Sequence, residues 1–104
     1  MKLVDVRLLF FDDCPNWRVA NDRLRTLACE FTDVTVAHHR VETPDEAERV
    51  GFRGSPTILI DGADPFATDS DSVGGLSCRV FKTPDGFAGS PTLEQLRHVF
   101  VDTQ

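Results

Sequence analysis

The residues of this chain best suited to chemistry are its three cysteines, Cys14, Cys29 and Cys78. A thiolate is a nucleophile and a soft metal ligand. No two of these cysteines are close enough for a Cys-x-x-Cys zinc motif, and the histidines show no ligand spacing around them, so we expect no metal site. An odd number of cysteines in 104 residues is also not the pattern of a disulfide scaffold. Each thiol must therefore be weighed by position, against the alternative of a small buried hydrophobe.

The position of Cys14 favours reactivity. Pro15 suits the first turn of a helix, which puts Cys14 at the N-cap or next to it. The free backbone N–H groups of the first helical turn and the helix dipole favour a thiolate there. Asp12 and Asp13 oppose this by like-charge repulsion, which water and salt weaken. We expect Cys14 to be a functional nucleophile.

The other two cysteines are placed less favourably for pairing with Cys14. Cys29 would lie about 22 Å further along the same helix, too far for a bridge, so we expect it to be structural. Cys78 would sit about 13 Å from the active end on a regular hairpin, which also favours a structural role. The polar loop 63–75 could change that register, so Cys78 stays the one candidate second thiol.

Seven elements are predicted to position these residues. Apolar periodicity and capping boxes place strands at 3–11, 33–40, 57–60 and 76–82, and helices at 17–31, 43–50 and 92–100. The first strand, helix and strand form a βαβ unit with parallel strands. The order β-α-β-α-β-β-α predicts an α/β fold with a mixed four-stranded sheet and helices on both faces. We expect one domain, 1–104, with 63–75 as a loop insertion.

Charge and hydropathy exclude several partners. The chain has 11 Lys and Arg against 17 Asp and Glu, a net charge of −6. This balance argues against nucleic acid and against an anionic membrane surface. No run approaches the ~20 apolar residues of a membrane span, and no small-residue cleavage site follows the N-terminal apolar stretch. We expect a cytoplasmic monomer.

Three segments resemble the thioredoxin-like superfamily. Cys14-Pro15-Asn16-Trp17 lies at the strand–helix junction where thioredoxins carry Cys-x-x-Cys. The segment 51–57, Gly-Phe-Arg-Gly-Ser-Pro-Thr, is similar to the thioredoxin segment that ends in a cis proline, and Thr92-x-x-Gln95-Leu96 matches the start of the last helix. The Cys-Pro-Asn-Trp motif and the segment 75–79, Gly-Leu-Ser-Cys-Arg, look like small bacterial thioredoxin-family proteins, some of them labelled as related to alkylmercury lyase.

The resemblance assigns roles to Pro56, Ser55 and Trp17, and its position three residues before Pro56 singles out Arg53. Pro56 would be cis and face Cys14, leaving the N–H and C=O of Ser55 unpaired to bind a substrate in strand-like fashion. Trp17 stands where the resolving cysteine of thioredoxins lies, so the site would be monothiol, and Trp17 either shields the sulfur or fills the core. Arg53 could offer its charge to a carboxylate-bearing thiol, although an exposed arginine is the alternative.

Three functions remain open on this basis. The first is a monothiol thiol–disulfide oxidoreductase or thiol transferase, in which Cys14 attacks a disulfide and a small thiol resolves the adduct. The second is a non-catalytic thioredoxin-fold binding module. The third is binding of a thiophilic metal or organomercurial by Cys14 and Cys78. We expect a small thiol or a protein thiol or disulfide as partner, and no cofactor beyond a low-molecular-weight thiol as co-substrate.

Overall fold

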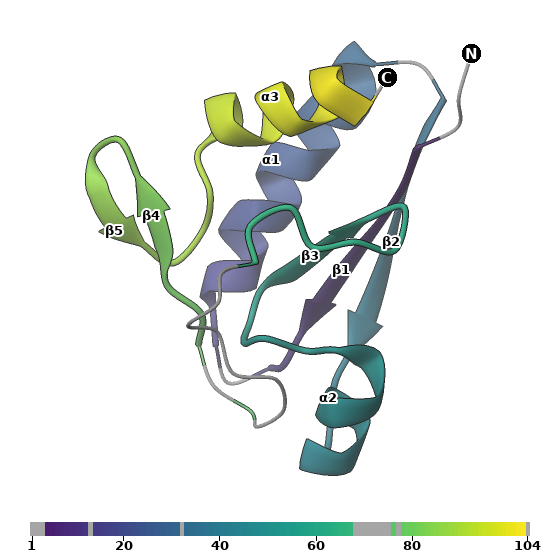
Figure 1. Ribbon diagram of the computed structural model, residues 1–104, viewed down its shortest axis with the longest axis vertical. Coiled ribbons are helices and arrows are strands. Elements are labelled where there is room, and N and C mark those ends of the chain that lie inside the picture. Colours follow the sequence, from purple (N-terminus) through teal and green to yellow (C-terminus); the bar gives the residue numbers. More distant parts are fainter. Residues whose placement is uncertain (1–3, 13, 32, 68–75, 77, 104) are drawn as a thin grey trace.

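A computed structural model describes residues 4–12, 14–31, 33–67, 76 and 78–103 (Figure 1). The elements, in chain order, are β1 (Val4–Phe10), α1 (Asn16–Glu30), β2 (Val34–Arg40), α2 (Pro44–Val50), β3 (Thr57–Ile60), β4 (Phe81–Thr83), β5 (Gly86–Ala88) and α3 (Leu93–Thr103). The chain is thus of mixed α/β type, as the sequence predicts. Within the described residues, no helix is long and apolar enough to cross a membrane.

A mixed three-stranded sheet, with strand order β2-β1-β3, forms the centre of the fold. β1 pairs in parallel with β2 and antiparallel with β3, as the pattern of the first three strands predicts. β1 is the middle strand, and its second half, Leu8 to Phe10, is buried on both faces. Such a strand must be apolar on both sides because helices cover both.

Helices do cover both faces of the sheet. Val4, Val6 and Leu8 of β1 face the larger core, where α1 and α3 pack together on one side of the sheet (Figure 1). Leu9 points to the other face, where α2 and the segments around it complete a smaller core. The two-residue alternation along β1 therefore decides which helix each side chain meets.

The ends of the two shorter helices follow the capping signals in the sequence. Thr43 caps α2, since its hydroxyl accepts a hydrogen bond from the Glu46 N–H at 3.1 Å, and Gly51 ends the helix with a φ of 76°. Thr92 and Gln95 bond reciprocally at the start of α3. These local devices fix both boundaries close to where they were expected.

The expected fourth strand of the sheet differs from the prediction. Within the described residues, β4 is only three residues long and pairs with β5 in a separate hairpin, which projects away from the sheet in Figure 1. The Pro84-Asp85-Gly86 turn folds β4 back on β5, and the Thr83 hydroxyl donates to the Gly86 carbonyl at 2.6 Å. Upstream, Cys78 forms a parallel bridge with Ser55, which draws this segment to the start of β3 instead of along it.

Part of the 63–75 loop lies outside the described residues, which include only 63–67 of it. Its described part is not exposed throughout, although the loop is polar. The carboxylate of Asp64 is only 6% exposed and is paired with arginines. This buried charge proves central to the site below.

Candidate functional site

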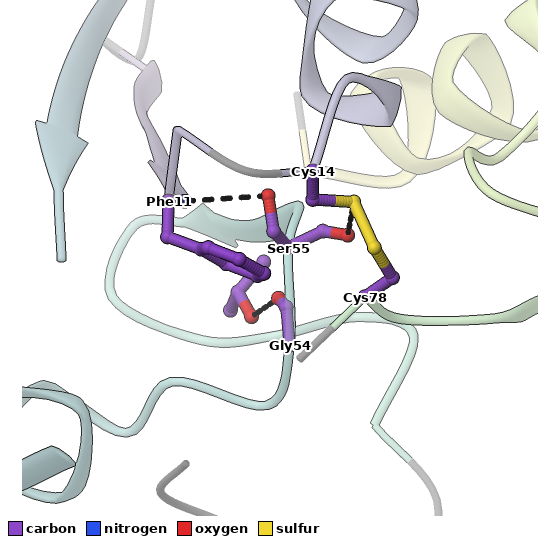
Figure 2. Close-up of a disulfide and its surroundings, with 6 residues drawn as sticks. Phe11, Cys14, Gly54, Ser55 and Cys78 are labelled. Atoms are coloured by element: carbon purple, nitrogen blue, oxygen red, sulfur yellow. Dashed lines mark hydrogen bonds between the residues drawn. A yellow bond between two sulfur atoms is a disulfide. The ribbon is translucent and has the colours of Figure 1, made fainter. Parts of the chain in front are cut away.

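Cys14 and Cys78 are joined by a disulfide, with their Cα atoms 5.8 Å apart (Figure 2). The site is therefore not monothiol, and the candidate second thiol is the partner of Cys14. A regular hairpin would have held Cys78 about 13 Å away. That geometry is wrong because Cys78 pairs in parallel with Ser55 and never runs along β3.

Cys14 lies in the tight connection between β1 and α1. Its backbone N–H donates to the Phe11 carbonyl at 3.3 Å, and Pro15 is the N-cap of α1. Cys14 therefore sits directly before the cap, as predicted. Its side chain is fully buried, and within the described residues no backbone N–H of α1 donates to its sulfur. The expectation that N–H groups of the helix bind the Cys14 sulfur is therefore not met.

The peptide bond between Ser55 and Pro56 is cis, as the resemblance implied. The Ser55 carbonyl oxygen lies 3.5 Å from the Cys14 sulfur (Figure 2). In the reduced state this oxygen can accept a hydrogen bond from the Cys14 S–H group, whereas the positive end of α1 favours the thiolate. The Ser55 carbonyl therefore favours the thiol form of Cys14, whereas the N-terminal end of α1 favours the thiolate form.

The Ser55 carbonyl is not left unpaired, which corrects the expectation of an open strand edge. It accepts a hydrogen bond from the Arg79 N–H at 3.0 Å. The Ser55 hydroxyl meanwhile accepts a weak bond from the Phe11 N–H at 3.4 Å. The chain's own segment at Cys78 and Arg79 therefore occupies the edge where a substrate strand was expected to bind.

Arg79 fixes this segment through a buried ion pair. Its guanidinium contacts the Asp64 carboxylate at 2.7 and 3.4 Å, and both side chains are about 95% buried. The guanidinium also lies over the Phe81 ring, 4.6 Å from its centroid. A buried charged pair with two bonds holds its geometry closely. Sequence reasoning missed this pair, because nothing in the polar pattern around Asp64 distinguishes a buried carboxylate from solvated ones.

Hydrogen bonds within the segment 53–57 stabilise the loop before Pro56. The Thr57 hydroxyl donates to the Gly54 carbonyl at 2.6 Å and accepts from the Arg53 N–H at 3.0 Å. The Arg53 guanidinium lies 3.7 Å from Asp64, so it shares that carboxylate with Arg79. Its expected role in binding a carboxylate-bearing thiol remains a prediction, and this ion pair competes with it.

Trp17 packs against the sheet on the first turn of α1. Its ring stacks on Phe10 with centroids 4.1 Å apart, and Arg18 lies 5.5 Å from its centroid. Trp17 also borders the larger core. These contacts fit the role of a partly buried core aromatic, and its role in binding a substrate stays a prediction.

An open pocket of about 310 Å³ lies at the carboxyl ends of β1 and β2. It is lined by Phe11, Asp12, Arg40, Val41, Glu42 and Leu76. Arg40 donates to Asp12 at 2.9 Å and to Glu42 at 2.7 Å, and the hydrogen bond to Glu42 raises the pKa of this guanidinium. Two carboxylates against one guanidinium leave the pocket with an excess of negative charge.

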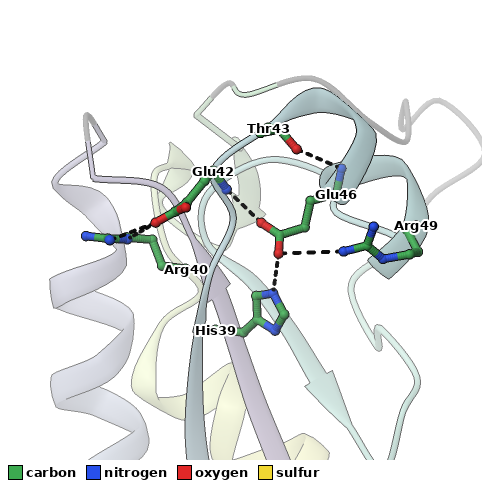
Figure 3. Close-up of polar contacts among 6 residues, drawn as sticks. All are labelled: His39, Arg40, Glu42, Thr43, Glu46 and Arg49. Carbon is green, nitrogen blue, oxygen red and sulfur yellow. Dashed lines mark hydrogen bonds and ion pairs between the residues drawn. The ribbon is translucent and has the colours of Figure 1, made fainter.

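A second polar cluster surrounds Glu46 at the start of α2 (Figure 3). One of its oxygens accepts from the Glu42 N–H at 2.8 Å, and the other lies 3.3 Å from His39 and 3.8 Å from Arg49. The backbone hydrogen bond from Glu42, followed by the contact with His39, lowers the pKa of Glu46. These contacts tie the first turn of α2 to its last turn and to the end of β2, so the cluster is structural.

Cys29 was expected to be structural, but it is a free cysteine, exposed on α1 and outside both cores. Among the described residues, no group of three or more His, Cys, Asp or Glu side chains could hold a metal ion. The chain matches no protein-family model and no curated protein sequence. The geometry around Cys14 and Cys78 therefore carries the argument for function.

Proposed function

We propose that this chain is a thiol–disulfide oxidoreductase of the thioredoxin-like superfamily, in which Cys14 and Cys78 alternate between a disulfide and two thiols. One observation carries the proposal. A disulfide formed by the cysteine that precedes α1 lies against the cis Ser55–Pro56 bond, with the Cys14 sulfur 3.5 Å from the Ser55 carbonyl oxygen.

The architecture supports the same proposal. A central β1 with parallel β2 and antiparallel β3, helices on both faces, and a cis proline directly before β3 are the features that the resemblance to thioredoxins implies. The chief departure is that no fourth strand lies beside β3 among the described residues. We therefore propose a thioredoxin-like fold whose fourth strand is replaced by the bridged segment at Cys78.

The proposed reaction transfers two electrons and two protons. A thiolate of the reduced protein attacks a substrate disulfide, one substrate thiol leaves and takes a proton, and a protein–substrate mixed disulfide forms. The second protein thiol then attacks the protein sulfur of that mixed disulfide. The second substrate thiol leaves with a proton, and the Cys14–Cys78 bond closes. A small thiol or a protein dithiol reduces the protein again by the reverse steps.

The partners follow from this chemistry. The substrate is a small or protein disulfide, the reductant is a thiol of the same kinds, and no other cofactor enters. A reductant of this type needs a reducing thiol pool to return it to the dithiol form, so we propose the cytoplasm as its compartment. We propose that it acts as a monomer, since each chain supplies both sulfurs.

The direct test uses the variant Cys29→Ser, which removes the exposed cysteine outside the site. The reduced variant is mixed with glutathione disulfide, and released glutathione is followed in time. We expect the second glutathione of each disulfide to be released at a rate at least about tenfold above that with free cysteine at equal thiol concentration, because the second protein thiol is already in place. The same protein with Cys14→Ser and Cys78→Ser added is the matched control and should release none. A rate no greater than that of free cysteine would reject the proposal.

A second candidate function, binding of a thiophilic metal ion, is favoured by one observation. The reduced sulfurs of Cys14 and Cys78 would be close enough to share a two-coordinate soft cation, since the two cysteines are near enough to bond. Equilibrium titration of the reduced Cys29→Ser variant with mercuric ion, in competition with glutathione, tests this function. One ion per chain that outcompetes millimolar glutathione, lost in the Cys78→Ser variant, would support it.

A further inference from the structure

The two sulfurs of the disulfide belong to residues of very different accessibility. Cys14 is fully buried, whereas Cys78 is exposed. Thiol–disulfide exchange requires the attacking thiolate to reach the sulfur that it attacks, from the side opposite the leaving sulfur. An approach to Cys78 from solvent, with Cys14 leaving toward the interior, meets this requirement. An attack on Cys14 would have to come through the packed protein.

We infer that Cys78 is the sulfur that exchanges with substrates, and that Cys14 is the buried resolving thiol. This assignment reverses the roles expected from the position of Cys14 before a helix. It rests on the proposed oxidoreductase function, and it names the residue that forms the mixed disulfide.

The segment that carries Cys78 is held in place by contacts that do not depend on the disulfide. The Arg79 N–H bonds the Ser55 carbonyl, and the Arg79 side chain is anchored on buried Asp64. Gly54 lies so close that a Cβ atom there would be 2.9 Å from the Cβ of Arg79. These contacts involve neither sulfur, so they persist when the disulfide opens. Cys78 then stays near Cys14, which makes the resolving step intramolecular and fast.

The exchange steps balance at this site. An external thiolate attacks the Cys78 sulfur, the bond between the two protein sulfurs breaks, and the Cys14 thiolate leaves. It takes up a proton from solvent and can then donate its S–H to the Ser55 carbonyl oxygen, which lies 3.5 Å away. A second external thiolate attacks the external sulfur of the mixed disulfide and releases Cys78. Two external thiols are oxidised to a disulfide, and the protein gains two thiols.

The experiment uses the oxidised Cys29→Ser protein, folded and at full length, with glutathione as the probe. Samples are quenched with acid during the first turnover and digested with trypsin. Cleavage at arginine and lysine places Cys14 on the peptide 8–18 and Cys78 on the peptide 54–79. We expect transient glutathione on the peptide 54–79, with at least about tenfold less on 8–18, because access decides which sulfur is attacked.

A second measurement avoids the transient species. In the Cys29→Ser background, the variant Cys14→Ser leaves Cys78 alone, and Cys78→Ser leaves Cys14 alone. Alkylation of the folded proteins by N-ethylmaleimide should be at least about tenfold faster at Cys78 than at Cys14. A urea-denatured sample of each variant gives the rate without burial, and the two rates should then converge.

The outcomes separate the two proposals. Glutathione on the peptide 8–18, together with faster native alkylation of Cys14, would overturn the assignment of Cys78 and leave the oxidoreductase proposal intact. A disulfide that glutathione opens only after denaturation would overturn both.

Discussion

Gly54, in the loop before Pro56, lies directly against Arg79, the residue that follows Cys78. Its φ is 107°, and an added Cβ atom would lie 2.9 Å from the Arg79 Cβ and 3.1 Å from the Arg79 Cα and N atoms. A side chain here must therefore displace backbone as well as adopt a conformation that L-residues rarely take. Only glycine lets Arg79 reach the Ser55 carbonyl.

The variant Gly54→Ala should separate the loop before Pro56 from Arg79. We expect a loss of about 1–3 kcal/mol in the free energy of unfolding of the oxidised protein, measured by urea denaturation. The disulfide should also form less readily in glutathione buffers, because Cys78 is no longer held beside Cys14. Gly62→Ala is the matched control, since Gly62 has a φ of 86° but open space around it. Equal effects of the two substitutions on disulfide formation would contradict the role given to Gly54.

The buried Asp64 carboxylate is a second residue-scale test. In Asp64→Asn the Arg79 guanidinium keeps a neutral acceptor but loses its counter-charge in a buried setting. We expect the oxidised protein to lose about 3 kcal/mol of unfolding free energy. Asp12→Asn removes an exposed ion pair with Arg40 and should change stability by less than about 1 kcal/mol. Similar losses in the two variants would show that Asp64 does not anchor Arg79.

Single-residue sequence signals predicted one half of the site. The proline before β3 and the cysteine before α1 are local features, and both lie where they were expected. The pairing of Cys78 and the burial of Asp64 depend on contacts between segments that are far apart along the chain. Neither contact leaves a periodic pattern, so the sequence alone favoured a distant Cys78.

At the scale of elements, the stability of α2 depends on the interactions near its N-terminus. Glu46 accepts the Glu42 N–H and lies beside His39 and Arg49, which lowers the pKa of Glu46 below its usual 4.5 (Figure 3). A carboxyl group whose pKa is lowered on folding stabilises the protein above its unfolded pKa. This stabilisation is lost as the pH falls through the lowered, folded-state pKa.

Glu46→Gln tests this assignment, because glutamine keeps the acceptor oxygen and removes the titration. Between about pH 7 and about pH 3, the unfolding free energy of the variant should fall less than that of the unsubstituted protein. Urea denaturation at each pH gives both curves. Parallel curves would mean that the Glu46 carboxylate contributes nothing to the acid sensitivity of the fold.

Element prediction succeeded where the signal was long or capped. The alternation along β1, the apolar stripe of α1 and the two capping boxes each placed an element within a few residues of its observed bounds. The segment after Ile60 is the exception. A strand was expected at 76–82, but among the described residues only β4 forms there. The turn at Pro84 and the contact between Arg79 and Asp64 determine the path of this segment, and the alternating pattern indicates neither of them.

At the scale of the whole molecule, the disulfide closes a long loop. Cys14 and Cys78 are 64 residues apart, so the bond links the start of α1 to the segment that precedes β4. Closing such a loop restricts the unfolded chain strongly, by about 4 kcal/mol in the chain-entropy treatment. The oxidation state of this one bond should therefore govern global stability.

We expect the oxidised Cys29→Ser protein to be more stable than its reduced form by about 2–4 kcal/mol. Urea denaturation with and without a reductant measures the difference, and the triple-serine variant, which also carries Cys14→Ser and Cys78→Ser, should show none. If reduction left the stability of the two-cysteine protein unchanged, the folded state would not contain the Cys14–Cys78 bond.

The most direct test of the account is the redox equilibrium of the three cysteines in the folded, unsubstituted chain. The protein is equilibrated in buffers with graded ratios of reduced to oxidised glutathione. The free thiols are then alkylated, and the masses of the tryptic peptides are measured by mass spectrometry. We expect a reversible two-electron transition that links the peptides 8–18 and 54–79, while Cys29 on the peptide 26–40 stays outside that bond. A Cys14 that never pairs with Cys78 at any ratio would contradict the account.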